Sequence, residues 1–351
     1  MRHAKKRGRT LAKVLVLALA IICAAAAAPK AAKLVAASKQ VQIGVTSARP
    51  AVSQENTHSD KEVPLQGSIT DFASLLPEVT QPAAPEAAPA GAKPVKTINL
   101  SPTSGIVFGS GRIKNNSDLS NATVSDILKT KSDIKVELNS DKPQVLIIHT
   151  HTTECYHTYD TGYYMADTAT RTKDETKNMV RVGQEIAKVL NAAGINTVQD
   201  TQIHDLSYNE AYSKSRASAK EYLKKYPSIK IVLDVHRDSI TYDDGTRAKP
   251  TVTINGQKAA QMMIIVGCDG KKTPIPNYRQ NLRFGAALGS AIEKKYPGLM
   301  RSLLFRYSFY NQDLTTGSIL VEMGSVANTL SEAVYSGKLL GSAMADYLKS
   351  L

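Results

Sequence analysis

Histidine and glutamate side chains follow an aliphatic run at residues 145–154, which read VLIIHTHTTE. His151 and Glu154 have an H-x-x-E spacing, so one loop could present a nitrogen and an oxygen to a single metal ion. Elsewhere, His236 directly follows the run IVLDV, and Glu322 lies inside the run SILVEMG. A catalytic zinc needs about three protein ligands, an open position for water and a carboxylate that takes the water's proton. Together these four residues predict that chemistry.

Each of these residues also has a structural interpretation. A histidine at the end of a strand is more often a hydrogen-bonding residue than a metal ligand. A buried acid such as Glu322, in contrast, is costly unless it is paired, neutralised or bound to a metal. His149 lies two residues before His151, so its side chain could point the same way and act as a ligand, a partner of a ligand or a transition-state donor.

The elements that must position these residues alternate along the chain. Aliphatic and alternating runs predict strands over residues 105–113, 134–138, 145–148, 195–198, 229–235, 262–267 and 318–324. Apolar stripes predict helices over residues 123–129, 176–193, 209–225 and 281–295, and a last helix after the capping-box pattern of Thr329 and Glu332. This rhythm predicts an α/β fold with a mainly parallel twisted sheet flanked by helices. In such sheets, functional side chains gather at the carboxyl ends of the strands.

The N-terminal part of the chain differs in composition. Basic residues precede the apolar run at residues 14–28, a pattern typical of an export signal or of a single membrane span. We favour the second interpretation, in which residues 1–28 form a cytoplasmic basic stub and an uncleaved membrane anchor. Residues 29–96 are rich in alanine and proline and predict a disordered linker. We expect residues 97–140 to be the N-terminal part of an exported domain and residues 141–351 to be its catalytic domain.

Composition and motifs exclude several functional classes. The formal charge is +13, but six of the positive charges precede the apolar run, so the excess in the rest of the chain is moderate. We expect a membrane-anchored protein whose catalytic domain lies outside the cytoplasm. Such a domain meets anionic cell-wall polymers, and we do not expect nucleic acid as a partner. Cys155 and Cys268 allow at most one disulfide outside the anchor, and no thiolate zinc motif is present. The HRD tripeptide at 236–238 lacks the asparagine and glycine-rich loop of a protein kinase.

Six segments resemble, in order, signature segments of the stage II sporulation protein P family: VLIIHTHTTECY, NMVRVGQEIAKVLNAAGINTVQDTQIHD, AYSKSRASAKEYL, IVLDVHRDS, YNQDL and ILVEMGSVANTLSEA. The resemblance covers residues 97–351 together with the anchor and tether. It implies a peptidoglycan hydrolase of sporulation and engulfment, with a fold similar to zinc-dependent N-acetylmuramoyl-L-alanine amidases and exopeptidases. It also implies endopeptidase action on stem peptides, and the stage II sporulation proteins D and M as partners.

The resemblance also implies roles for single residues. Glu322 matches the catalytic glutamate of the amidases, and His151 and His236 match their zinc-binding histidines. The third ligand stays open between Glu154, as in zinc carboxypeptidases of related fold, and Asp174 or Glu175, as in the amidases.

Further residues have two interpretations each. Arg237 and Asn311 are either substrate or oxyanion contacts or structural residues, and His204 is a structural or groove residue.

The expected reaction is attack of zinc-activated water, with Glu322 as base, on the amide between muramic acid and L-alanine. The alternatives are a zinc peptidase that cuts only stem-peptide cross-links and a non-catalytic wall-binding module.

Overall fold

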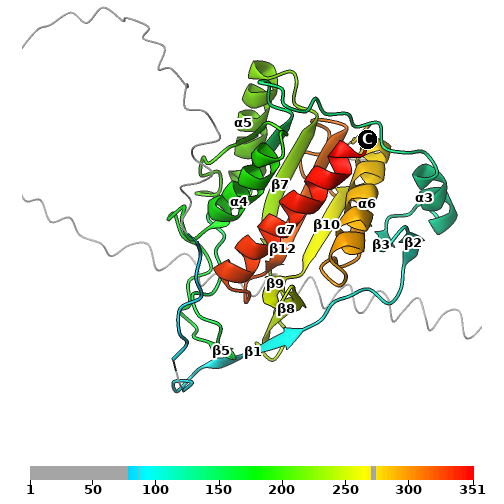
Figure 1. Ribbon diagram of the computed structural model, residues 1–351. Helices are drawn as coiled ribbons and strands as arrows, with labels where there is room; N and C mark the ends of the chain where they lie inside the picture. The colour runs from blue at the N-terminus through cyan, green and yellow to red at the C-terminus, as the bar shows by residue number, and fades with distance from the viewer. Residues whose placement is uncertain (1–77, 86, 270–273) are drawn as a thin grey trace, which may run out of the picture. The chain divides into compact units, whose positions relative to one another are not determined.

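The computed structural model describes residues 78–85, 87–269 and 274–351 (Figure 1). The predicted anchor at residues 1–28 and most of the predicted linker at 29–96 lie outside these ranges. Within these ranges, no helix has the length and apolar character that a membrane span requires.

Eight strands form the main sheet in the order β2-β3-β11-β10-β12-β7-β4-β6. Their bounds in chain order are β2 Ile106–Phe108, β3 Gly111–Asn116, β4 Val145–Ile148, β6 Thr197–Gln199, β7 Ile231–Asp238, β10 Met262–Gly267, β11 Leu303–Arg306 and β12 Gly317–Ser325. Only the pairs β2–β3 and β10–β12 are antiparallel, and the other five pairs are parallel. The predicted α/β class with a mainly parallel sheet is therefore confirmed.

Helices cover both faces of this sheet. They are α3 Asn121–Leu128, α4 Met179–Ala192, α5 Ala211–Lys225, α6 Tyr278–Lys295 and α7 Leu330–Lys349, with a 3-10 turn η1 at Tyr208–Glu210. The side chains of β4 alternate: Val145 and Ile147 join the core shared with α4, α6 and α7, whereas Leu146 and Ile148 pack with Ala219 of α5. Because successive strand residues face opposite ways, α5 lies on the face opposite α4, α6 and α7 (Figure 1).

The helix ends follow the sequence signals. Asn178 caps α4 by accepting a hydrogen bond from the Val180 N–H at 2.9 Å, so the helix begins at Met179, three residues later than predicted. Gly194 takes the predicted left-handed conformation with φ of 81° just after α4. At the start of α7, both hydrogen bonds of the Thr329–Glu332 capping box are present.

A second sheet has four strands in the order β5-β1-β8-β9, namely β1 Lys93–Ile98, β5 Tyr163–Tyr164, β8 Arg247–Ile254 and β9 Gln257–Ala260. The sequence predicted none of them. The first four residues of β1 lie in the segment predicted as linker, because residues 93–94 pair with β5 and residues 95–98 pair with β8.

The strand predicted at residues 134–138 was wrong. This segment is in no ladder, although Ile134 is buried in the core and the Glu137 N–H donates to Gln144 Oε1 at 3.2 Å. Its apolar alternation reflects packing against the core. Because β3 pairs with β11, residues 97–140 and 141–351 contribute strands to the same sheet.

Candidate active site

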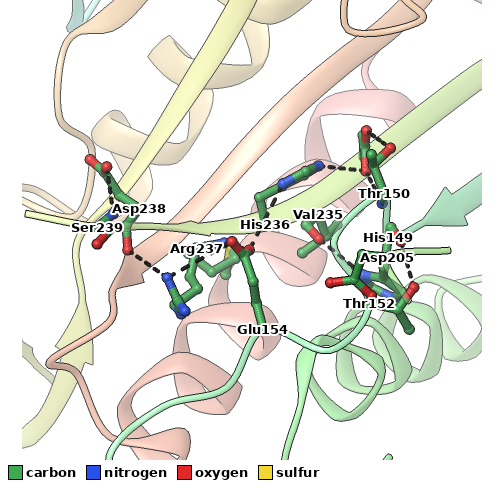
Figure 2. A network of polar contacts seen from close by, with 12 residues as sticks. His149, Thr150, Thr152, Glu154, Asp205, Val235, His236, Arg237, Asp238 and Ser239 are labelled. Carbon is green, nitrogen blue, oxygen red and sulfur yellow. Dashed lines mark hydrogen bonds and ion pairs between the residues drawn. The ribbon is translucent and has the colours of Figure 1, made fainter. Parts of the chain in front are cut away.

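The carboxyl ends of β4, β7 and β12 meet at one edge of the main sheet, since the three strands are parallel neighbours. In this register Glu322 of β12 lies opposite His236 of β7. The rings of His151 and His236 are edge-on, with centroids 5.3 Å apart. His236 Nδ1 is 3.9 Å from Glu154 Oε2, which Figure 2 shows beside it. The structure thus brings together the four residues that predicted zinc chemistry: His151, Glu154, His236 and Glu322.

Three atoms of this cluster are buried without a hydrogen-bond partner among the described residues: His151 Nδ1, His236 Nε2 and Glu322 Oε2. His236 Nε2 lies at ion-pair distance from Asp234, whereas His151 Nδ1 and Glu322 Oε2 have no such partner among these residues. A buried polar atom left unpaired costs about 1–3 kcal/mol, so such atoms call for an explanation. A nitrogen lone pair and a carboxylate oxygen at the same edge are the atoms that a metal ion and its bound water would use.

Asp234 of β7 holds both His236 and the loop after β4. Its Oδ1 lies 2.8 Å from His236 Nε2, an ion-pair distance, although the ring N–H is not aligned for a hydrogen bond. It also accepts hydrogen bonds from the Thr150 N–H at 2.9 Å and the Thr150 hydroxyl at 2.7 Å. Burial lowers the pKa of His236, but the carboxylates of Asp234, Glu154 and Glu322 outweigh burial and raise this pKa to about 9.

Glu322 is fully buried. Burial raises the pKa of its carboxyl to about 8, and the negative charges of Asp238 and Glu154 act in the same direction, whereas His236 opposes them. A carboxyl with a pKa near neutrality can both accept and return a proton at physiological pH.

Arg237 fastens the loop that carries Glu154 (Figure 2). Its N–H donates to Glu154 Oε2 at 3.3 Å, and its Nη1 lies 3.8 Å from Glu154 Oε1. Its Nε donates to the Cys155 carbonyl and its Nη2 to the Thr170 carbonyl, both at 2.8 Å. The guanidinium is buried and engaged on all sides, so the geometry gives Arg237 a positioning role.

A second anchor of the same loop was not predicted from the sequence. The Asp205 carboxylate accepts hydrogen bonds from the Thr153 N–H at 3.1 Å and the Thr153 hydroxyl at 2.7 Å, and it forms an ion pair with Arg171. Arg171 Nη2 is also 3.8 Å from Glu154 Oε1. The TTE stretch is therefore held from both sides, and no local sequence pattern indicated Asp205 or Arg171.

His149 lies in a different environment from His151. Its Nδ1 is 3.0 Å from the Val235 carbonyl, and its Nε2 is 2.8 Å from the amide nitrogen of Gln199. Burial lowers its pKa to about 4, so the ring is neutral, with Nδ1 donating and Nε2 accepting. Neither nitrogen is left for a metal. Because β4 ends at Ile148, strand alternation does not carry His149 and His151 to the same side.

The remaining candidates have other partners. Asn311 donates to the Tyr212 carbonyl at 2.9 Å, and His204 Nε2 is 2.9 Å from Asp200 Oδ2.

The candidates for the third ligand differ in their surroundings. Asp174 accepts hydrogen bonds from Thr176 and pairs with Lys177, and Glu175 is exposed, whereas Glu154 is buried beside His236. The geometry therefore favours Glu154 as the third ligand. Cys155 and Cys268 are buried free thiols.

As the side chains lie, no group of three or more histidine, cysteine or acidic residues in the described ranges could hold a metal ion. Ligation by His151, Glu154 and His236 therefore requires side-chain adjustment, and it stays a prediction.

Comparisons with solved structures give low scores. The N-acetylmuramoyl-L-alanine amidase AmiC2 of Nostoc punctiforme matches with a TM-score of 0.33 and 11% identity, over 59% of this chain and 96% of that chain. Ami1 of Mycobacterium smegmatis gives 0.36 and 11%, over 60% and 100%. A metallo-carboxypeptidase from Burkholderia cenocepacia gives 0.34 and 9%, over 62% and 60%. Scores this low carry no argument about fold or function.

Comparison of sequences is more informative. The chain is 33% identical over 208 residues to the stage II sporulation protein P of Bacillus subtilis (strain 168), which covers 56% of this chain and 49% of that protein. The chain thus spans about half the length of the curated relative that it matches. A model of the family Stage II sporulation protein P (SpoIIP) matches residues 43–345, which is most of the sequence, so the chain belongs to that family.

Proposed function

We propose that the chain is a peptidoglycan hydrolase, a zinc-dependent N-acetylmuramoyl-L-alanine amidase that acts on the cell wall during endospore formation. Family membership supports the wall as substrate. The observation that carries the proposal is the pair of buried, unpartnered atoms, His151 Nδ1 and Glu322 Oε2, at the sheet edge beside His236.

The donor set fits zinc. His151, Glu154 and His236 would hold the ion through two ring nitrogens and a carboxylate, a combination found in catalytic zinc sites. Asp234 lies at the far nitrogen of His236, and such a carboxylate orients a histidine ligand and makes it more basic. When bound, zinc would polarise the scissile carbonyl and lower the pKa of a bound water.

The chain's own groups perform the proton transfers. Glu322 takes the proton of the attacking water and returns it to the amine of L-alanine as the amide bond breaks. Burial suits it to both steps, because a pKa of about 8 lies close to the working pH. Arg237 and Arg171 hold Glu154 in place and do not take part in the proton transfers.

The test is digestion of purified sacculi by the full-length chain. We expect new L-alanine amino termini and peptide-free glycan strands, loss of both products after chelation, and their return when zinc is added. Loss of cross-bridges with intact glycan–peptide links would instead indicate a stem-peptide endopeptidase. Binding to sacculi without any cleavage, unaffected by chelation, would indicate a non-catalytic wall-binding module and contradict the proposal.

Paired variants identify the third ligand. We expect Glu154→Gln to lose bound zinc, measured by metal analysis, while Asp174→Asn and Glu175→Gln keep it. Loss of zinc in one of the latter two, with zinc kept in Glu154→Gln, would move the ligand to the segment before α4. Family membership further supports an anchored location outside the cytoplasm and the stage II sporulation proteins D and M as partners, which stay predictions.

A further inference from the structure

The YNQDL segment at residues 310–314 forms a strained turn beside the site. Tyr310 and Asn311 have φ angles of 46° and 53°, in the left-handed region. Asparagine tolerates this region, but a tyrosine there is uncommon, and such strain costs about 1–3 kcal/mol and often occurs at functional sites. The Asn311 amide donates to the Tyr212 carbonyl at 2.9 Å and to Ser215 Oγ at 3.2 Å. The turn is therefore tied to the first turn of α5.

This attachment fixes the ring of Tyr212 against the site. The Tyr212 centroid lies 5.8 Å from that of His151, nearly perpendicular to it, and 6.4 Å from that of His236, nearly parallel to it. The ring of Tyr310 also packs against Tyr212, with the two centroids 5.9 Å apart. Tyr212 thus contacts the rings of both proposed histidine ligands.

The other tyrosines nearby are placed differently. Tyr208 stacks on His151 at 4.9 Å but is 66% exposed and has no ring contact with His236. Tyr310 contacts Tyr212 and neither histidine. Among the described tyrosines, Tyr212 is therefore the one positioned between the two ligand candidates.

The hydroxyl of Tyr212 has no hydrogen-bond partner among the residues that the structure describes. Tyrosine hydroxyls in partly buried positions usually have one. In this protein the Tyr156 hydroxyl donates to the Met323 carbonyl at 2.8 Å, and the Tyr164 hydroxyl donates to the Gly245 carbonyl at 2.6 Å. A held ring with an unused donor, next to two histidines, is the arrangement expected of a group that binds the substrate.

We propose that Tyr212 is a further catalytic residue of the proposed reaction, whose hydroxyl donates a hydrogen bond to the scissile carbonyl oxygen as that oxygen becomes negative. This inference rests on the proposed function. The tyrosine keeps its proton throughout, so no bond in Tyr212 is made or broken. A hydrogen bond that strengthens only as charge develops lowers the barrier of the chemical step and leaves substrate binding nearly unchanged.

The test compares Tyr212→Phe with Tyr222→Phe in the zinc-loaded full-length chain. Both variants remove one hydroxyl from α5, but the Tyr222 hydroxyl bonds the Gln199 carbonyl at 3.4 Å and its ring contacts neither histidine. On a soluble glycan–peptide fragment, we expect Tyr212→Phe to lower kcat by about 10- to 100-fold with KM little changed, since a hydrogen bond to a charged group has that strength. Tyr222→Phe should match the unsubstituted chain.

A second readout does not depend on turnover. A phosphinate analogue with a tetrahedral, negatively charged group at the scissile position should bind Tyr212→Phe more weakly by the same factor, with zinc content unchanged. Unchanged kcat and unchanged analogue affinity in Tyr212→Phe would overturn the inference and leave the ring as packing. If the unsubstituted chain and Tyr222→Phe release no L-alanine amino termini either, the proposed function fails, and the inference is overturned with it.

Discussion

Glu322→Gln should abolish wall hydrolysis and at the same time stabilise the metal-free protein, by an amount that depends on pH. The carboxyl is fully buried and its pKa is raised from 4.5 to about 8, mainly by burial. Between these two pH values the unfolded chain gives up this proton while the folded chain keeps it. The free energy of unfolding therefore falls as pH rises through this window.

The magnitude follows from the size of the shift. One proton held only by the folded state gives a slope of about 1.4 kcal/mol per pH unit. Between pH 4.5 and pH 7 the wild-type chain thus loses about 3 kcal/mol through this group. Glutamine is nearly isosteric with the protonated acid and does not titrate. Glu322→Gln should therefore match the wild type near pH 4.5 and exceed its stability by about 3 kcal/mol at pH 7.

The measurement is urea denaturation of the chelated proteins at several pH values between 4.5 and 8. Glu221→Gln, which removes an exposed carboxyl on α5, serves as the control and should show no pH-dependent difference from wild type. His236 also contributes to the pH dependence of stability, because folding raises its pKa to about 9. Asp234 is the main cause of that rise and is present in every variant, whereas Glu322 is the last of its causes. A stability difference between Glu322→Gln and wild type that stays flat with pH would refute the reasoning.

Two further substitutions test how the site is held. Gly183→Ala would place a Cβ 2.5 Å from His149 Nε2. We expect the free energy of unfolding to fall by about 1–2 kcal/mol, measured by thermal unfolding, despite the better helix propensity of alanine. An unchanged or higher melting temperature would contradict the tight packing of α4 on His149. Asp205→Ala would leave Thr153 and Arg171 without their acceptor. We therefore expect the free energy of unfolding, measured in urea, to fall by about 2–3 kcal/mol. A decrease below about 0.5 kcal/mol would show that these contacts do not hold the loop.

The main sheet was predictable because its strands are aliphatic. VLII, IVLDV and MMIIVG are buried on both faces, and such runs identify a central strand without knowledge of its neighbours. The second sheet was not predictable for the converse reason. Its strands read KPVKTI and QKAA, with lysine and proline at positions that do not alternate, so neither periodicity nor β propensity indicated them.

The direction in which neighbouring strands pair could not be predicted from local sequence patterns. Strand β10 runs antiparallel to β12, a direction that no feature of MMIIVG indicates. The first long helix, in contrast, was predicted because its stripe of Met179, Val182, Ile186 and Leu190 is set by helix geometry alone.

The same contrast applies to the site. His151, Glu154, His236 and Glu322 could be predicted because strand ends in a parallel sheet gather at one edge. Their supports could not, because Asp205 and Arg171 meet the loop from distant segments. Position along a strand was also insufficient for His149, whose ring partners come from β6 and β7.

Asp234 is the exception among the supports, because the sequence held a signal for it. Like Glu322, Asp234 is an acid inside an aliphatic strand, IVLDV, and it is only 3% exposed, so its burial is equally costly unless it is paired. The two acids offset the free-energy cost of burial in opposite ways, one by pairing and the other by staying protonated. Asp234 stays charged, since Thr150 and His236 satisfy both of its oxygens, and this pins the loop after β4 to β7. Glu322 keeps one oxygen unpaired, and in the metal-free protein burial raises its pKa to about 8, so that its carboxyl is mostly protonated at neutral pH. The fully paired acid, Asp234, therefore positions the residues of the site. The acid with an unpaired oxygen, Glu322, has an oxygen available for proton transfer.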